Sequence, residues 1–346
     1  MRKNLAFMAI CSATPLANCT PQPHPPVAAL DAAIEEDDGG RIVGGELAEP
    51  GSAKWQIQIH STARYNKIEQ SEDAKLARGD PDKLYLSERS GHQLTHRCGG
   101  SYIGNGWILT AAHCVVLKPV KGQTDGGVLV NRLVRIGTQD LSPLGGGATY
   151  SIDVLVIHAG YSKTKPKDDI AMIRIHEKPK TAALVAQGRL AAITLQKPGD
   201  PDLFDEETLR VTGWGWTGAR TDKSAARLDR QGKTQINPSE LMQVSVNYLP
   251  GTRCSSIENY AKFWNARIIC AGSLEAGKDA CTGDSGGPLT RKQGSERVLV
   301  GIVSQGVGCA FKRIPGAYTR VSAYQAWIGA AKAVTQKGLT ILPEPN

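Results

Sequence analysis

The stretch DACTGDSGGP, residues 279–288, decides how the rest of this sequence is interpreted. It sets Ser285 among three glycines. A serine hydroxyl is a weak nucleophile until a neighbouring imidazole accepts its proton. The glycines let the backbone bend so that two N–H groups point at a developing oxyanion, which they stabilise by about 3–4 kcal/mol per donor. The stretch therefore predicts a nucleophilic serine, a chemistry that also requires a histidine and a carboxylate.

Two other motifs supply these partners. LTAAHC, residues 109–114, is an apolar strand that runs into His113, and DDIAMI, residues 168–173, opens another apolar strand with two acids. The imidazole needs a buried carboxylate, which fixes its tautomer and stabilises the imidazolium. Each motif alone is only suggestive, but the three together, in the order His, Asp, Ser, are specific.

On these motifs the sequence resembles the chymotrypsin/trypsin family of serine proteases, over most of the chain from Ile42 to about Ala333. The resemblance implies an all-β fold of two six-stranded Greek-key β-barrels, with the active site between them and a C-terminal helix. The 38 glycines, the few aromatic residues and the short apolar runs broken by turns also favour an all-β architecture. Apolar side chains recur at helical spacing within Ala323–Ala333, so we expect the helix there.

The resemblance also implies the catalytic roles. His113 is expected to be the general base, Asp169 the orienting carboxylate and Ser285 the nucleophile. The backbone N–H groups of Gly283 and Ser285 would form the oxyanion hole. Asp169 is chosen over Asp168 because the family's aspartate directly precedes the aliphatic residue, and Asp168 is then expected to be a solvated neighbour.

The primary specificity pocket follows from the same resemblance. Asp279, six residues before the nucleophile, matches the pocket floor, where a carboxylate attracts Arg or Lys; the alternative is a surface carboxylate. Ala280 lacks a hydroxyl that would help to bind a lysine ammonium, whereas arginine can still bond Asp279 bidentately, so we expect Arg over Lys. The other implied substrate-binding residues are Ser304, Gly306 and Gly316. Gln305 stands where the family usually has Trp, which should weaken apolar preference at further subsites.

The first 41 residues are interpreted as processing signals. Residues 1–19 predict an export signal, with Arg2 and Lys3 ahead of an apolar stretch. LANC, residues 16–19, resembles a bacterial lipobox in which Cys19 would be lipidated, although Asn18 departs from that pattern; the alternative is a plain signal peptide with an incidental cysteine. We therefore expect a secreted or extracytoplasmic protein that Cys19 would tether to the membrane at the cell envelope.

Residues 20–41 are interpreted as a proline-rich linker and an activation propeptide, and residues 42–346 as the protease domain. An acidic run and two glycines lead to Arg41, which directly precedes the strand-like Ile42-Val43-Gly44-Gly45. A buried unpaired carboxylate at Asp284 would be costly. The resemblance implies that the ammonium freed at Ile42 pairs with Asp284, so we expect a zymogen that another protease or a second copy of the chain cleaves after Arg41.

Eight cysteines, an even number, follow or lie within the export signal, and no CxxC pair suggests zinc. Two, Cys11 and Cys19, belong to the N-terminal segment. The family resemblance implies three disulfides among the other six: Cys98–Cys114, Cys254–Cys270 and Cys281–Cys309.

Charge and composition limit the partners. The 41 Lys and Arg outnumber the 33 Asp and Glu, which gives a formal charge of +8. No basic cluster is interleaved with aromatic residues, so we expect no nucleic-acid partner. We expect a monomer that acts on polypeptides with Arg or Lys at the cleavage site and needs no cofactor or metal; the run after Thr138 offers calcium only one acid, Asp140. The alternative function is a catalytically silent binding or adhesion protein with the protease fold, which would require a broken triad or oxyanion glycine.

Two insertions distinguish the chain from compact members of the family. The first, Thr62–His96, is charged, and we expect a short helix over Glu69–Arg78. In the family this loop borders the leaving-group side of the cleft, so it would restrict or recruit substrates; the alternative is a surface loop without a role. The second, Gly218–Pro238, is rich in Lys and Arg.

Overall fold

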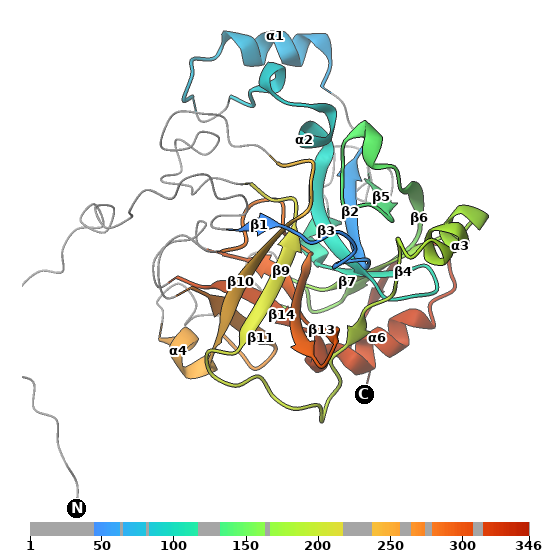
Figure 1. The fold of residues 1–346 in the computed structure, drawn as a ribbon, viewed down its shortest axis with the longest axis vertical. Helices are drawn as coiled ribbons and strands as arrows, with labels where there is room; N and C mark the ends of the chain where they lie inside the picture. Colours follow the sequence, from blue (N-terminus) through green and yellow to red (C-terminus); the bar gives the residue numbers. More distant parts are fainter. Residues whose placement is uncertain are drawn as a thin grey trace, which may run out of the picture. The chain divides into compact units, whose positions relative to one another are not determined.

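Two closed antiparallel barrels form the described part of this computed structural model (Figure 1). The described residues are 45–62, 65–80, 83–116, 132–162, 167–216, 237–256, 264–273, 279–306 and 314–345. The predicted export signal, the linker, Arg41, Ile42, Cys309 and nearly all of the second insertion lie outside these ranges.

The first barrel closes through pairing of β6 with β7. Around the barrel the strands run β6-β5-β2-β3-β4-β7. Its members are β2 (Gln56–Ser61), β3 (His96–Tyr102), β4 (Trp107–Thr110), β5 (Arg132–Ile136), β6 (Ala148–His158) and β7 (Ala171–Ile175). Counted along the chain, the fourth strand lies beside the first, which is the Greek-key arrangement.

The second barrel repeats that arrangement and closes through pairing of β10 with β9. Around the barrel the strands run β10-β11-β14-β13-β12-β9. Its members are β9 (Thr208–Gly213), β10 (Met242–Leu249), β11 (Ile268–Gly272), β12 (Pro288–Gln293), β13 (Glu296–Gln305) and β14 (Gly316–Arg320). The prediction of two six-stranded Greek-key barrels is therefore confirmed.

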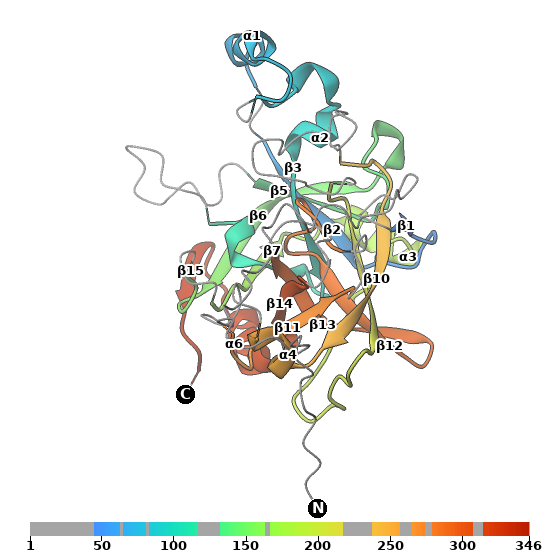
Figure 2. The same ribbon diagram turned by 90° about the vertical axis from the view of Figure 1, so that its left-hand side faces the viewer.

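Three short strands extend the barrels. Two of them, β1 (Glu46–Leu47) and β8 (Thr194–Leu195), pair with β10 and β13 of the second barrel. The third, β15 (Gly338–Leu342), follows the C-terminal helix and pairs in parallel with β6, beside which it lies in Figure 2. The C-terminal segment thus joins the first barrel after the chain has completed the second.

Each barrel is filled by its inward-facing apolar side chains. In β10, residues 242–249, exposed Ser245 and Asn247 alternate with buried Val244 and Val246, as expected where one strand face packs inward. The second core contains such side chains from β9 to β14. The first core also contains residues of the C-terminal helix, with Trp327 fully buried.

The helices are short and cover the barrels or connect strands. The α-helices are α1 (Lys67–Lys75), α2 (Gly91–Thr95), α3 (Pro179–Ala186), α4 (Gly251–Ser255) and α6 (Gln325–Lys332). The 3₁₀ turns are η3 (Leu86–Glu88), η4 (Ala112–Cys114), η5 (Pro143–Gly145) and η6 (Val321–Tyr324). The predicted C-terminal helix is confirmed as η6 followed by α6. No helix in the described ranges is long and apolar enough to cross a membrane.

The first insertion is a folded unit that carries α1, η3 and α2 at the end of the molecule opposite α6 (Figure 1). Asn66 caps α1 by accepting the N–H groups of Ile68 and Glu69 at 2.9 Å. Asp73 is buried and accepts N–H bonds from Leu84 and, at 2.8 Å, from Leu86. The predicted helix exists, although it begins and ends a few residues earlier than expected.

Candidate active site

The serine turn, residues 281–287, is fixed by its own backbone hydrogen bonds. The N–H of Asp284 donates to Cys281 O at 3.0 Å, and that of Gly287 donates to Asp284 O at 2.8 Å. Gly283 has φ +105°, which side-chain-bearing residues rarely adopt. A Cβ at Gly283 would also lie 2.8 Å from Asn237 Nδ2. Glycine is therefore required at this turn by both backbone conformation and space.

His113 and Asp169 are brought together by the first barrel. His113 lies in η4 after β4, and Asp169 lies just before β7, which pairs with β4. The Nδ1 of His113 is 2.7 Å from Asp169 Oδ2, and the His113 N–H donates to Asp169 Oδ1 at 2.9 Å. The carboxylate holds the ring through both backbone and side chain, which fixes the Nδ1–H tautomer and leaves Nε2 as an acceptor.

Ser304 joins this pair from the second barrel. Its hydroxyl donates to Asp169 Oδ2 at 2.5 Å, and Thr319 Oγ1 donates to the Asp169 carbonyl at 2.9 Å. Burial by itself would raise the pKa of Asp169, but the charge of His113 and the hydrogen bonds from His113 and Ser304 hold that pKa below its usual value. Ser304 was predicted only as a substrate-binding residue, so its hydroxyl contact with Asp169 was missed.

The expectation that Asp168 is solvated is wrong. Asp168 is only 6% exposed, because its Oδ1 accepts a bond from Tyr324 OH at 2.8 Å and one from Arg267 at 3.1 Å. Arg267 also donates to Glu344 beyond β15, at 3.0 Å. The sequence alone could not reveal this burial, because the two partners of Asp168 come from distant segments: Arg267 directly precedes β11 (Ile268–Gly272), and Tyr324 ends η6.

A cavity of about 220 Å³ lies beside the serine turn. Asp279 lines it and is 3% exposed, which contradicts the alternative of a surface carboxylate. Asp279 Oδ1 accepts the N–H of Ala280 at 2.8 Å. The remaining predicted pocket residues also line this cavity, together with Ser285 and Gln305: Ala280, Ser304, Gly306 and Gly316.

Asp284 is fully buried within the turn. Its two carboxylate oxygens accept the N–H groups of Gly215 and Cys281, each at 2.8 Å. Burial raises the pKa of Asp284 to about 6, and the two N–H bonds only partly oppose this rise. Within the described ranges no basic side chain forms an ion pair with Asp284.

Two further contacts, which the sequence did not predict, support the serine turn from its other side. The Nε2–H of His96 donates to Gly283 O at 2.9 Å, and the Trp216 N–H donates to Thr282 O at 2.8 Å. Burial lowers the pKa of His96 to about 4, so its ring is neutral at physiological pH. Only the fold brings these residues to the turn, since His96 ends the first insertion and Trp216 precedes the second.

The disulfides agree with expectation wherever the chain is described. Cys98–Cys114 and Cys254–Cys270 are both formed. Cys281 is also disulfide-bonded, and its expected partner Cys309 lies outside the described residues. The sulfurs of Cys98 and Cys114 lie near His113, but the bond between them makes this group unsuitable as a metal site.

A positive charge on β5, the guanidinium of Arg135, is fixed against the loop after Thr138. The guanidinium of Arg135 donates to the carbonyls of Leu141, Ser142 and Gly146 at 2.7–3.2 Å. Asp140 is engaged by Ser142 through the backbone N–H at 2.8 Å and the hydroxyl at 2.6 Å. The absence of calcium from this loop stays a prediction, and the position of Arg135 gives it a physical reason.

Comparisons with known proteins agree with this geometry. The family model described as Trypsin matches residues 77–328, which is more than half of the chain. The chain belongs to the trypsin family of serine proteases. Trypsin delta and trypsin gamma of Drosophila melanogaster are each 32% identical to it over 290 residues, covering 84% of this chain and 87% of theirs.

Longer members of the trypsin family match over the same part of the chain. Coagulation factor XI of Bos taurus is 32% identical over 290 residues, which cover 83% of this chain and 37% of its own length. Serine proteinase stubble of Drosophila melanogaster is 30% identical over 296 residues, again 83% of this chain. The chain thus belongs to a family of serine protease hydrolases, and its described residues form the two barrels and two of the three disulfides that the resemblance implied.

Proposed function

We propose that the chain is a secreted serine endopeptidase that cleaves after Arg, and less well after Lys, once its precursor has been cut between Arg41 and Ile42. One observation carries the proposal: the pair formed by His113 and Asp169 is joined through Ser304 to a cavity with buried Asp279. Ser285 lines the same cavity. The alternative of a silent binding protein has no support from the described site, since the three motif residues and Gly283 are intact.

Ser285 Oγ attacks the scissile carbonyl while His113 Nε2 removes its proton. Asp169 holds Nδ1–H and stabilises the imidazolium. The N–H groups of Gly283 and Ser285 stabilise the oxyanion. The imidazolium then protonates the leaving amine, and water, activated by the same imidazole, hydrolyses the acyl-enzyme. The low pKa of Asp169 suits this role, because the carboxylate stays charged at the pH where the imidazole works.

Asp279 selects the residue on the acyl side of the scissile bond. It is a buried carboxylate, and the other described residues that line the cavity are uncharged, so a cationic side chain gains a strong partner there. Arginine makes two parallel hydrogen bonds to a carboxylate, and Ala280 offers no hydroxyl to lysine. The substrate class is therefore polypeptides with Arg, and secondarily Lys, at the cleaved bond.

Activation supplies a positively charged partner for the Asp284 carboxylate. In the uncleaved chain the nitrogen of Ile42 is part of a peptide bond, and cleavage after Arg41 makes it an ammonium. That ammonium pairs with Asp284 and orders the turn that holds Gly283. The activating enzyme is another protease or a second copy of this chain.

The protein acts outside the cytoplasm as a monomer, and Cys19 is the site of its membrane tether.

The proposal is tested by treating the full precursor with a trace of trypsin and assaying matched Arg, Lys and Phe esters. The precursor should be inactive, and the protein with Ile42 at its N-terminus should hydrolyse the esters in the order Arg, Lys, Phe. The Ser285→Ala precursor, treated in the same way, measures the contribution of the added trypsin.

Two results would overturn parts of the proposal. If the protein with a confirmed Ile42 N-terminus hydrolyses no ester beyond the Ser285→Ala control, the chain is not this enzyme. If it hydrolyses the Phe ester faster than the Arg ester, the assignment of Asp279 to the pocket floor is wrong.

A further inference from the structure

A second cavity, of about 400 Å³, lies on the other side of the serine turn from the Asp279 cavity. Thr282 lines both cavities, whereas Gly283 lines only the second. The backbone at Thr282 and Gly283 therefore separates the two spaces. A polypeptide that places a basic residue beside Asp279 and its carbonyl at the N–H of Gly283 must continue past Gly283 toward the second cavity.

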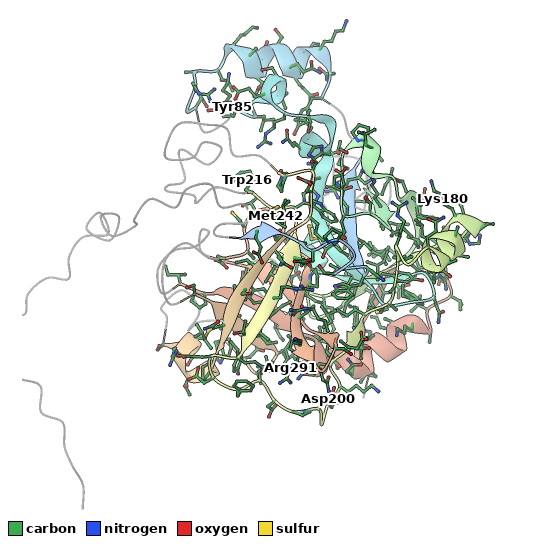
Figure 3. The ribbon with its side chains drawn as sticks, in the orientation of Figure 1. Tyr85, Lys180, Asp200, Trp216, Met242 and Arg291 are labelled. Carbon is green, nitrogen blue, oxygen red and sulfur yellow. A yellow bond between two sulfur atoms is a disulfide. The ribbon has the colours of Figure 1, made fainter. Side chains whose placement is uncertain are left out.

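The first insertion builds much of this cavity. Leu84, Leu86 and Arg89 come from the insertion, and they face Trp216, which follows β9. Figure 3 places Trp216 between the insertion, marked by Tyr85, and the region of Met242 at the start of β10. The cavity therefore exists because the insertion is folded against the serine turn.

The insertion wall is held in place by buried hydrogen bonds. Asp73 of α1 accepts the N–H groups of Leu84 and Leu86, and the OH of buried Tyr85 accepts the Gly79 N–H at 2.7 Å. Arg78 stacks over the Tyr85 ring at 5.4 Å. A wall fixed in this way can select among substrates, because little order has to be gained on binding.

Positive charge is the distinctive property of the lining. Arg89 and Arg97 both line the cavity, and no carboxylate is among those of its lining residues that the structure describes. Arg89 lies over the Trp216 ring at 6.0 Å, and the Nη1 of Arg97 donates to the carbonyls of Leu94 and His96 at 2.7 and 2.8 Å. Both guanidinium groups are thus held beside the apolar surface of the cavity.

We propose that this cavity binds an acidic side chain of the substrate, on the leaving-group side of the scissile bond, and that Arg89 selects it. The inference rests on the proposed function and extends it to a second substrate element. Residues of an extended chain are spaced by about 3.3 Å and alternate in direction, so one of the first three residues after the scissile bond enters the cavity. The preferred substrate carries Arg before the bond and Asp or Glu shortly after it.

The test uses internally quenched peptides with one fixed sequence up to the scissile Arg. Glu, Gln or Lys is placed in turn at the first, second or third position after the bond. At one position, kcat/KM should be about fivefold higher for Glu than for Gln and about tenfold higher for Glu than for Lys, as expected for a partly exposed charge pair and its reversal. The preference should weaken at high salt.

Arg89→Glu should reverse the ratio of Glu to Lys at that position. Lys75→Glu is the matched control, because it makes the same charge change in the same insertion, on α1 and outside the cavity lining. It should keep the wild-type ratio. Equal rates for Glu and Lys peptides at all three positions, or the same ratio in the Arg89→Glu and wild-type enzymes, would overturn the inference.

The ester assay separates this inference from the proposed function, because esters have no residue in the second cavity. If the Arg ester is hydrolysed but Glu and Lys peptides are cleaved at equal rates, the proposed function stands and the cavity's role is rejected. If the ester is not hydrolysed, the proposed function fails, and fluorescently labelled Glu and Lys peptides titrated against the Ser285→Ala protein still decide the matter. Tighter binding of the Glu peptide is expected, and equal binding would reject the cavity's role.

Discussion

Asp169 and Asp284 are two buried carboxylates at the same site, and their surroundings shift their pKa values in opposite directions. Asp169 is bonded by His113 and Ser304, and its pKa lies below the usual value. Asp284 is bonded only by two backbone N–H groups within the described residues, and its pKa rises to about 6. Similar burial thus has opposite consequences, because among the described residues only Asp169 has a side-chain partner, His113, that can carry a positive charge.

The difference indicates which part of the site is complete before cleavage. The His113–Asp169 pair already has short, well-directed bonds, so it needs no further group. Asp284 is poised to accept a positive charge, and its backbone connects directly to Ser285 and Gly283. We infer that activation acts on the serine turn and leaves the histidine side of the site as it is.

The largest expected effect comes from a substitution in the His113–Asp169 pair, the part of the site that is complete before cleavage. Asp169→Asn should lower kcat for the Arg ester by about 10⁴-fold, the size of the loss in triads of this family, because the ring loses the Nδ1–H tautomer. The measurement is steady-state hydrolysis by the activated protein. Asp168→Asn is the matched control, since an amide oxygen can still accept bonds from Tyr324 and Arg267. An equal loss in both variants would contradict a specific role for Asp169.

A substitution at Asp284, which lacks its positive partner before cleavage, should lower kcat by a smaller factor. Asp284→Asn cannot form an ion pair with the Ile42 ammonium, so the N–H of Gly283 should be misplaced in the activated protein. We expect kcat to fall by about 10²–10³-fold, the cost of losing an oxyanion donor. N-terminal sequencing confirms that the variant has been cleaved. Full activity of the cleaved variant would show that this ion pair is not needed.

The pKa of Asp284 also predicts how the stability of the precursor depends on pH. The folded pKa of about 6 lies above the ordinary aspartate value of 3.8, so the folded state binds the proton more tightly than the unfolded state. Stability is therefore highest below about pH 4 with respect to this group, and falls by roughly 2–3 kcal/mol as pH rises through about 6. Urea unfolding of the Ser285→Ala precursor measures the fall, which Asp284→Asn should abolish. The same fall in both proteins would refute this assignment.

The smallest expected effect on kcat comes from Ser304, and it tests whether this partner helps to position Asp169. Ser304→Ala removes one hydrogen bond to a charged oxygen, worth about 1.5–3 kcal/mol, and water replaces part of it. We expect kcat to fall by about tenfold and the pKa of Asp169 to rise. Ser304→Thr keeps a hydroxyl and should recover part of the activity. If Ser304→Ala leaves kcat unchanged, the contact with Asp169 has no role in positioning.

Much of the fold and of the candidate site could be predicted from short sequence motifs. The three motifs carried the family resemblance, and that resemblance implied the fold, the disulfides in the described ranges and the meeting of His113 with Asp169. The resemblance also implied a buried Asp279, because the family has the floor of its pocket at that position. These features depend on residues that are close in sequence or on strands that the family resemblance arranges.

Features formed between distant segments could not be predicted. Asp168 looked like a solvated acid, but Arg267 and Tyr324 reach it from elsewhere in the fold. The strand β15 pairs in parallel with β6, which lies far earlier in the chain, and the sequence of β15 carries no strong signal of that partner. The role of the first insertion also stayed open, because its fold depends on bonds that Asp73 accepts from Leu84 and Leu86, which come much later in the insertion.

The most direct test of the difference between the two carboxylates is the pKa of Asp284 before and after cleavage. Carbon-13 NMR of labelled aspartate carboxyls in the Ser285→Ala chain, assigned with Asp284→Asn, gives both values without self-digestion. We predict a pKa of about 6 in the precursor and a clearly lower pKa once Ile42 is the N-terminus. The same pKa in both forms would contradict the account, because the new ammonium would then not reach Asp284.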